Sequence, residues 1–453
     1  MTQPVPAATD DGESLVRPAP PRLALRTSLA RLSVRPRSVL LLIAVPVAAI
    51  VCGIIGWLLD WKIGVDSAVY RAGALTLLHG DPLYDANTLP TEPFWALLPF
   101  TYPPTAALLF VPLAALPTQV AWGVIIAISV LAMALVIRIA IGSLPRPEGE
   151  LPRWAAPGRA TIIFSLVALG LEPVWRGIFL GQINLILMAL IVLDVLVISA
   201  RGSKWGGVLV GVAAAVKLTP LVFVPHLFFT GKKMDALRAL GTFFGLQALM
   251  FLITPHDAAR FWTRTLQDTG RIGPLHWAGN QSLTGMINRL TGLASWSQQL
   301  AMGIMLLLAP FALMLMLRFH RRGQALAALL VPAFWALLFT PVSWSHHWVW
   351  AVPLIVLLIS RLPQTTPATA WRRWLGAFAV AAVFISCILL ILPNGRNLEL
   401  HWAFWQNILG SAYVLMPVVL AIVLVVRWWL MRRKRLRAAG ASVDDYVDAT
   451  TSS

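Results

Sequence analysis

The chain has 453 residues, of which 58% are apolar and only 12% are charged, and its formal net charge is +17. A soluble domain carries about 25% charged residues, so this composition excludes an ordinary soluble protein and indicates a polytopic membrane protein. The basic residues stand in short connectors and tails and no basic–aromatic module is visible, so we expect contacts with membrane lipids and none with nucleic acid.

The two ends of the chain are polar tails. Residues 1–37 are rich in proline and alanine and carry six arginines, which predicts a disordered tail on the cytoplasmic side. The apolar run 38–59 is too long for the core of a signal peptide, so we expect a retained span. The basic tail 432–453 should also be cytoplasmic, which leaves 38–431 as the membrane domain.

Apolar runs along the chain predict an all-α protein with about twelve spanning helices. The candidates are 38–59, 103–116, 118–141, 160–175, 183–200, 206–228, 237–254, 298–317, 324–342, 347–360, 373–392 and 408–430. If 103–116 and 206–228 are re-entrant instead, ten spans fit the charges of the connectors better. Both counts leave the loops 60–102 and 255–297 outside, where we expect interfacial helices.

The first outer loop opens on LDWKIGVDSAVYRAG, which holds Asp60 and Asp66 in a chain with 19 acidic residues. If this segment is helical, Asp66, Tyr70 and Arg71 lie on nearly one face. A carboxylate near the apolar boundary is partly desolvated, which raises its proton affinity and suits it to act as a general base. The alternative is that both acids are solvated loop residues or helix caps.

Two adjacent histidines, His346 and His347, stand among tryptophans in PVSWSHHWVW at the outer end of a span. Neighbouring residues on a helix point about 100° apart, so at most one would face a given cavity. Imidazole can donate to an oxyanion, which favours phosphate recognition, although interfacial anchoring is the alternative. No further ligands at helical spacing accompany the pair, so we expect no metal site.

Other polar groups stand in a second outer loop and inside an apolar run. The loop RTLQDTGRIGPLHWAGNQSLTGMINRL offers the donors Arg271, His276, Asn280 and Gln281, which suit hydroxyls and phosphates, or else form a structural connector. Lys217 in VKLTP lies within an apolar run, where a charge is costly and indicates a functional site. Snorkelling to an interface is the alternative.

Six motifs occur in series between about residues 55 and 350. They are VDSAVYRAG…LHGDPLYD, LPFTYPPTAALLF, EPVWRGIFLGQIN, GVAAAVKLTPL, GNQSLTGMINRL and PVSWSHHWVW. Together they resemble the GT87 family of GT-C glycosyltransferases, the actinobacterial polyprenol-phosphate-mannose-dependent α-(1→2)-mannosyltransferases. The resemblance implies a GT-C domain in the plasma membrane with its active site on the extracytoplasmic face.

The resemblance also implies the substrates. The donor would be polyprenyl phosphate mannose, and the acceptor would be a phosphatidylinositol mannoside, lipomannan or lipoarabinomannan. Because histidine and arginine side chains could stabilise the leaving phosphate, we expect no cofactor or metal. The family's first-loop aspartate falls on Asp66, and its paired histidines fall on His346 and His347. We expect the substrates to be bound by Asp60, Tyr70, Arg71, Tyr102, Lys217, Arg271, His276, Asn280 and Gln281.

In the mechanism that follows, Asp66 takes the proton of the acceptor's 2-hydroxyl as that oxygen attacks C1 of mannose. The polyprenyl phosphate leaves from the opposite face, so the configuration inverts. A histidine with an outer-loop arginine would stabilise the departing phosphate. The alternatives are a GT-C arabinosyltransferase that uses polyprenyl phosphate arabinose, a transporter or flippase, for which the sequence has no internal repeat, and a structural envelope scaffold.

Overall fold

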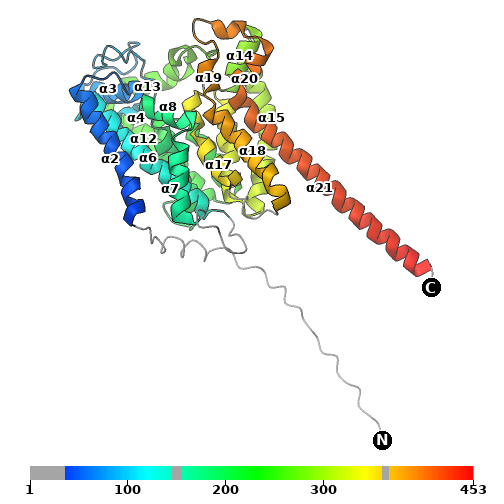
Figure 1. Cartoon of the computed structure of the whole chain (residues 1–453). Coiled ribbons are helices and arrows are strands. Elements are labelled where there is room, and N and C mark those ends of the chain that lie inside the picture. Colours follow the sequence, from blue (N-terminus) through cyan, green and yellow to red (C-terminus); the bar gives the residue numbers. More distant parts are fainter. Residues whose placement is uncertain (1–35, 145–155, 360–366, 452–453) are drawn as a thin grey trace. The chain divides into compact units, whose positions relative to one another are not determined.

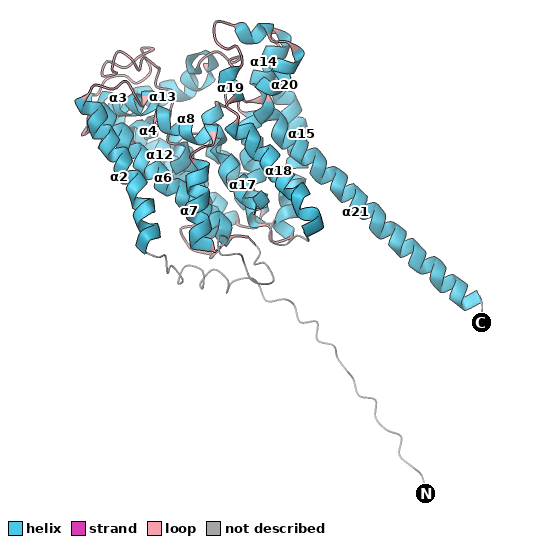
Figure 2. Cartoon of the chain, viewed as in Figure 1, coloured by secondary structure: helices cyan, strands magenta, loops and turns pink. Residues whose placement is uncertain are grey.

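Helices make up the regular structure of this computed structural model, which describes residues 36–144, 156–359 and 367–451 (Figure 2). Among these residues the only β-pairing is an isolated bridge between Asn280 and Trp344. The all-α prediction is therefore confirmed for the described chain. The predicted N-terminal tail, apart from its last two residues, lies outside the described ranges.

The elements follow one another in the order shown in Figure 1. The first half holds α2 (Pro36–Leu58), α3 (Val65–His79), α4 (Pro104–Leu109), α5 (Val111–Ala114), α6 (Thr118–Gly142), α7 (Pro157–Ala168), α8 (Glu172–Leu180), α9 (Asn184–Leu193), η2 (Asp194–Ile198), α10 (Val208–Val216), η3 (Thr219–Val222), α11 (Phe223–Phe229) and α12 (Lys233–Ile253). The second half holds α13 (Pro255–Thr263), η4 (Thr265–Gln267), η5 (Thr269–Ile272), α14 (Leu283–Thr291), α15 (Ser297–Arg321), α16 (Ala325–Phe339), η6 (Ser345–Trp350), α17 (Ala351–Ile359), α18 (Pro367–Ile385), α19 (Ile388–Ile391), η7 (Leu398–His401), α20 (Phe404–Gly410) and α21 (Ala412–Thr451).

Five stretches in the described chain are long and apolar enough to cross a membrane. They are Thr118–Gly142, Lys233–Ile253, Ser297–Arg321, Trp374–Ile391 and Ala412–Met431. The pair α7 and α8, which bends by 70°, would make a sixth span if it is counted as one. Shorter apolar helices cover Ile43–Leu58, Asn184–Ile198, Thr219–Phe229, Ala325–Phe339 and Ser345–Ile359.

The two predicted spans that could instead be re-entrant are both broken in the structure. The stretch 103–116 is not one helix, because α4 has six residues and α5 has four. At 1.5 Å of rise per residue they reach about 9 Å and 6 Å, which is far short of a bilayer core. The stretch 206–228 is interrupted after α10 ends at Val216, because the backbone of Lys217 is extended and Pro220 then lies in a short 3₁₀ turn.

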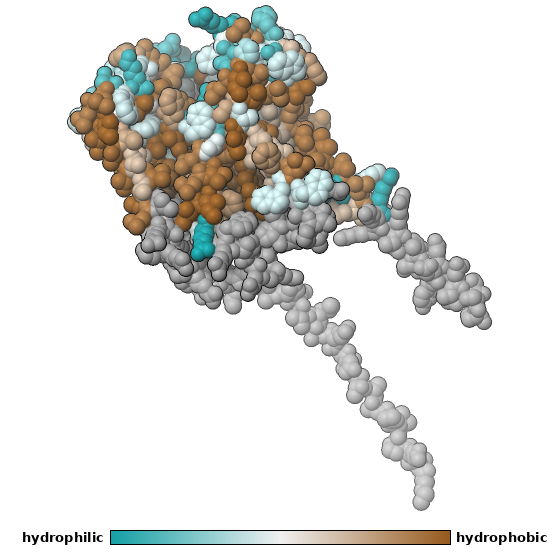
Figure 3. Space-filling model, viewed as in Figure 1, coloured by the Kyte–Doolittle hydropathy of each residue, from teal (hydrophilic) through white to brown (hydrophobic). Residues whose placement is uncertain are grey.

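The apolar surface of the bundle carries large side chains that no described residue covers, such as Leu307, which is 80% exposed. Figure 3 shows apolar residues over the middle of the visible face and polar residues gathered at one end. Figure 1 shows α3, α13, α14 and α20 at the same end of the bundle. A lipid-facing band with polar ends is the pattern of a membrane protein.

Helix α2 packs closely against α6 through a pair of glycines. A Cβ atom on Gly53 would lie 2.7 Å from the carbonyl oxygen of Gln119, and one on Gly123 would lie 2.7 Å from that of Ala49. Small residues let two membrane helices approach until their backbones touch. This contact fixes the end of α2, from which the chain turns into α3.

Candidate functional site

The first turn of α3 carries Asp66 and is held against the end of α8. Gly64 precedes α3 and Gly181 follows α8, and both have left-handed backbones with φ of 74°. A Cβ atom on Gly181 would clash with the Ser67 hydroxyl, and one on Gly64 would lie 2.5 Å from Cδ1 of Trp122. Only glycine fits both positions, so the packing brings Asp66 close to Gln182.

The Asp66 carboxyl is partly buried, at a helix N-terminus where the backbone dipole favours negative charge. Burial raises the pKa of Asp66 from its usual 3.8 to about 6, although the Gln182 amide and the charges of Lys217 and Arg176 act to lower it. A carboxylate with this pKa is ionised at neutral pH and is still basic enough to accept a proton.

Two tyrosines pack beside this carboxyl. The Tyr70 hydroxyl donates to Oε1 of Gln182 at 3.0 Å and lies 3.0 Å from the Tyr102 hydroxyl. Tyr70 is fully buried, and its ring stacks on Phe110 with a centroid separation of 4.5 Å. The ring contacts and hydrogen bonds hold Gln182 in place next to Asp66.

A chain of hydrogen bonds leads from Gln182 to His347. Asn184 Nδ2 donates to Gln182 Oε1 at 3.2 Å and to the backbone oxygen of His346 at 3.1 Å. Lys217 Nζ donates to Asn184 Oδ1 at 3.1 Å and lies 3.1 Å from His347 Nε2. The backbone of Lys217 is extended where α10 gives way to η3, and the chain of bonds from Gln182 to His347 joins residues from three separate motifs.

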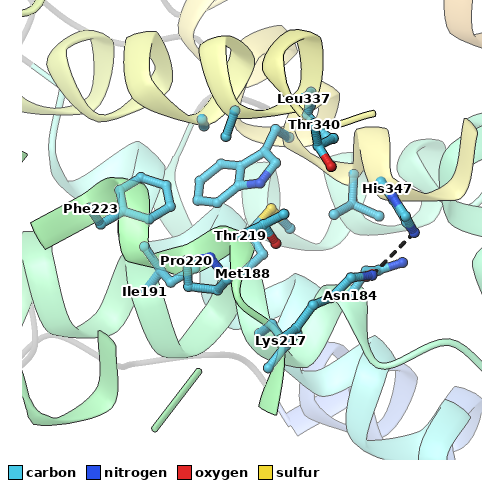
Figure 4. A pocket seen from close by; sticks show the side chains of 15 residues that line it. Asn184, Met188, Ile191, Lys217, Thr219, Pro220, Phe223, Leu337, Thr340 and His347 are labelled. Atoms are coloured by element: carbon cyan, nitrogen blue, oxygen red, sulfur yellow. Dashed lines mark hydrogen bonds between the residues drawn. The ribbon is translucent and has the colours of Figure 1, made fainter. Parts of the chain in front are cut away.

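An apolar pocket opens beside this network (Figure 4). Its polar lining consists of Asn184, Lys217, Thr219, Thr340 and His347, and its apolar lining consists of Leu187, Met188, Ile191, Pro220, Phe223, Ala333, Ala336, Leu337, Val349 and Trp350. Ligand pockets are mostly apolar, with a few placed polar groups that fix orientation. This pocket suits an apolar chain that ends in an anion.

The neighbouring histidine, His346, is not part of the pocket lining. Its ring is perpendicular to that of His347, at a centroid separation of 4.8 Å. His346 is only 7% exposed, and neither ring nitrogen has a partner in the described chain. The structure thus brings both histidines to the site, with different neighbours.

Glu172 anchors the segment that carries the histidines. This fully buried carboxylate accepts hydrogen bonds from the Ser345 hydroxyl and the Tyr413 hydroxyl, each at 2.8 Å, and from Arg176 Nη1 at 3.4 Å. The arginine is therefore fixed near Asp66. Glu172 and Gln182 stand out in the sequence as polar insertions like Lys217, with helix capping as the alternative. The sequence did not point to Arg176 or Asn184, although both belong to the same motif, EPVWRGIFLGQIN.

Two predicted substrate-binding residues of the first loop do not join the network. Arg71 is on α3, but its Nε atom donates to the carbonyl of Leu116 at 2.6 Å. Asp60 lies in the exposed turn after α2, with a φ of 51°, and its side chain makes no hydrogen bond or ion pair with any described residue.

The predicted donors of the second outer loop are bonded within the protein. The Arg271 guanidinium donates to three backbone carbonyls, those of Tyr84, Ala86 and Phe100. His276 Nε2 lies 2.9 Å from Asn397 Oδ1. These contacts hold the two long outer loops together and attach the second loop to the segment before η7.

The amides of Asn280 and Gln281 are also engaged. They donate to the backbone carbonyls of Leu275, Pro341, Ala278 and Gly410. The Asn280 oxygen accepts from the backbone of Ser282 and Ser343. These bonds fasten the second outer loop to the chain just before the histidines. In the described residues, no group of three or more His, Cys, Asp or Glu side chains could hold a metal ion.

Known proteins resemble this chain over most of its length. Residues 100–341 match the family described as glycosyltransferase family 87. A polyprenol-phosphate-mannose-dependent alpha-(1-2)-phosphatidylinositol mannoside mannosyltransferase of Mycobacterium tuberculosis is 32% identical over 403 residues, which are 83% of this chain and 88% of that protein. The protein of the same description in Mycolicibacterium smegmatis is 32% identical over 383 residues, which are 80% and 83% of the two chains.

A third relative has a different description. It is a polyprenol-phosphate-mannose-dependent alpha-(1-2)-phosphatidylinositol pentamannoside mannosyltransferase of Mycolicibacterium smegmatis, 34% identical over 305 residues, which are 65% of this chain and 69% of that protein. No solved structure matches the chain with significance.

Proposed function

This chain belongs to glycosyltransferase family 87, and we propose that it transfers mannose from polyprenyl phosphate mannose to the 2-hydroxyl of a mannosylated glycolipid. The acceptor is a phosphatidylinositol mannoside, lipomannan or lipoarabinomannan. The names of the relatives support the donor and the first of these acceptors. One observation carries the proposal. Lys217 and His347 lie at the polar end of an apolar pocket, and Asp66 is close enough to Lys217 for their charges to interact.

The donor binds with its polyprenyl chain in the apolar pocket and its phosphate at Lys217 and His347. A lysine ammonium has three protons to donate. In this structure Asn184 accepts one and His347 Nε2 lies within reach of a second, which leaves the third for a phosphate oxygen. A charge-assisted bond of this kind stabilises the leaving group as negative charge develops on it.

The reaction needs one base and one stabilised leaving group. The acceptor's 2-hydroxyl oxygen attacks C1 of mannose and forms the new C–O bond while its proton passes to Asp66. The bond between C1 and the phosphate oxygen breaks, and the polyprenyl phosphate leaves with the electron pair. Attack and departure on opposite faces invert the configuration from β to α. Protein side chains supply these functions, with no cofactor or metal.

We propose a GT-C architecture with about ten crossings in the plasma membrane, because 103–116 is too short to span, and 38–431 as its catalytic domain. The basic tails 1–37 and 432–453 are cytoplasmic, because positive charge in short flanking segments marks that side. The loops 60–102 and 255–297 are then extracytoplasmic, and so is the end of α3 that carries Asp66.

The proposal is tested with the purified protein in detergent and radiolabelled polyprenyl phosphate mannose. Phosphatidylinositol mannosides should gain a mannose that an α-1,2-specific mannosidase removes. Polyprenyl phosphate arabinose, supplied in parallel, distinguishes the arabinosyltransferase alternative. A transporter or flippase would need a sealed compartment and would make no new glycoside, so the absence of any product in detergent would contradict the proposal.

A further inference from the structure

A pair of tryptophans, Trp277 and Trp344, lies outside the lining of the donor pocket. The rings of Trp277 and Trp344 have a centroid separation of 6.0 Å and are tilted by 45°. Trp277 is 43% exposed, and Trp344 is partly exposed. Neither residue lines the apolar pocket.

The tryptophan pair adjoins the charged part of the site through Gly279. A Cβ atom on Gly279 would lie 3.5 Å from the Trp344 ring and 3.9 Å from Arg176 Nη2. The carbonyl of Gly279 accepts from the Ser345 backbone at 2.8 Å, which fixes this spacing. Because Gly279 has no side chain, the Trp344 ring and the Arg176 guanidinium both lie beside its Cα atom.

His346 supplies an independent observation. It follows Trp344 by two residues and is 93% buried, yet neither ring nitrogen has a partner in the described chain. A buried polar group without a hydrogen bond costs free energy, so the His346 ring needs a partner from water or from a bound ligand. An imidazole offers one donor and one acceptor, which matches a sugar hydroxyl.

We propose that Trp277, Trp344, Arg176 and His346 form a subsite for the acceptor glycan, which binds the mannose next to the one that receives the new residue. This inference rests on the proposed function. A sugar ring has an apolar face that packs on an indole and hydroxyls that pair with guanidinium and imidazole nitrogens. The donor's lipid and phosphate occupy the other pocket, so the acceptor is the substrate that this subsite binds.

The test compares Trp277→Ala and Trp277→Phe on two acceptors, an alkyl α-mannoside and the corresponding α-1,6-linked alkyl dimannoside. For Trp277→Ala we expect the KM of the dimannoside to rise about tenfold, while that of the monomannoside rises less than about twofold. Trp277→Phe should recover most of the loss, and the donor KM should not move. Trp405→Ala is the matched control, because Trp405 is 57% exposed and has no part in the subsite.

Any other result contradicts the proposed subsite. An equal loss on both acceptors, or no loss on either, shows that Trp277 does not contact the second mannose and is an interfacial anchor instead. A changed donor KM assigns the tryptophan to the donor side. If the wild-type protein transfers no mannose to phosphatidylinositol mannosides, the proposed function itself is wrong. The subsite alone is wrong if Trp277→Ala binds the dimannoside, in the absence of donor, with the same dissociation constant as the wild type.

Discussion

Lys217 and His347 meet with 3.1 Å between Nζ and Nε2, although they are 130 positions apart in the chain. A charged lysine has only protons to offer, so Nε2 of His347 is the acceptor, and the ring proton of a neutral His347 is on Nδ1. The contact ties the break after α10 to the start of η6. It also puts a positive charge at the polar end of the apolar pocket.

Replacement of Lys217 by glutamine should weaken donor binding. The variant loses the charge-assisted bond to phosphate, so the donor KM should rise by about 10- to 100-fold while the acceptor KM stays nearly constant. Steady-state kinetics with each substrate varied in turn measure the two constants. Lys204→Gln removes an exposed lysine and serves as the control. An unchanged donor KM in the Lys217 variant would exclude the phosphate role.

The pH profile of transfer should report the ionisation of Asp66, whose pKa burial raises to about 6. A base works only when it is deprotonated, so kcat/KM should be level above pH 6 and fall about tenfold per pH unit below it. The Gln182 amide lowers this pKa, and Gln182→Met should therefore move the inflection to higher pH.

Glu92 provides the control for the profile, because burial raises its pKa to about 7. This carboxyl lies in the first outer loop, outside the network around Asp66. The variant Glu92→Gln should keep the inflection near pH 6. If the inflection disappears in that variant, the profile reports Glu92, and the assignment to Asp66 is wrong.

A pair of glycine variants should separate backbone strain from site packing. Gly181 and Gly80 both end a helix in the left-handed conformation, with φ of 74° and 76°. A Cβ atom on Gly181 would clash with Ser67, whereas one on Gly80 would meet nothing within 4 Å. Both alanine variants should lose about 1 to 2 kcal/mol through strain, and Gly181→Ala should lose more.

Activity distinguishes the two glycines further. Gly181→Ala should reduce transfer, because the clash displaces the first turn of α3 and with it Asp66, whereas Gly80→Ala should retain it. Thermal unfolding followed by tryptophan fluorescence in detergent, together with the transfer rate, measures both effects. Equal activity in the two variants would show that the Gly181 contact does not position the carboxyl.

The sequence indicates the all-α class and several of the residues that the structure brings together. Asp66 and Tyr70 are one helical turn apart, so their common face follows from the 3.6-residue period. Lys217 stands out because a charge inside an apolar run needs a polar surrounding. These inferences depend on local spacing and on the cost of burying charge, and both are visible in the sequence.

Contacts between distant segments of the chain cannot be predicted from the sequence alone. Asn280 and Gln281 look like free donors in a loop, but the fold places backbone carbonyls from 341 and 410 beside them, and buried amides take such partners. Arg271 is occupied in the same way. Arg176 could have been found from the sequence, because it follows Glu172 by four residues. On a helix such a spacing predicts the ion pair that the structure shows on α8.

Asp66 is the base in the proposed mechanism, and the variant Asp66→Asn tests that role directly. Asparagine keeps the shape of the side chain but cannot take the proton, so kcat for mannosyl transfer should fall by at least about 100-fold while the donor KM changes little. Asp81→Asn, an exposed acid of the same loop, should transfer at the wild-type rate. Transfer by Asp66→Asn within a few-fold of wild type would contradict the mechanism.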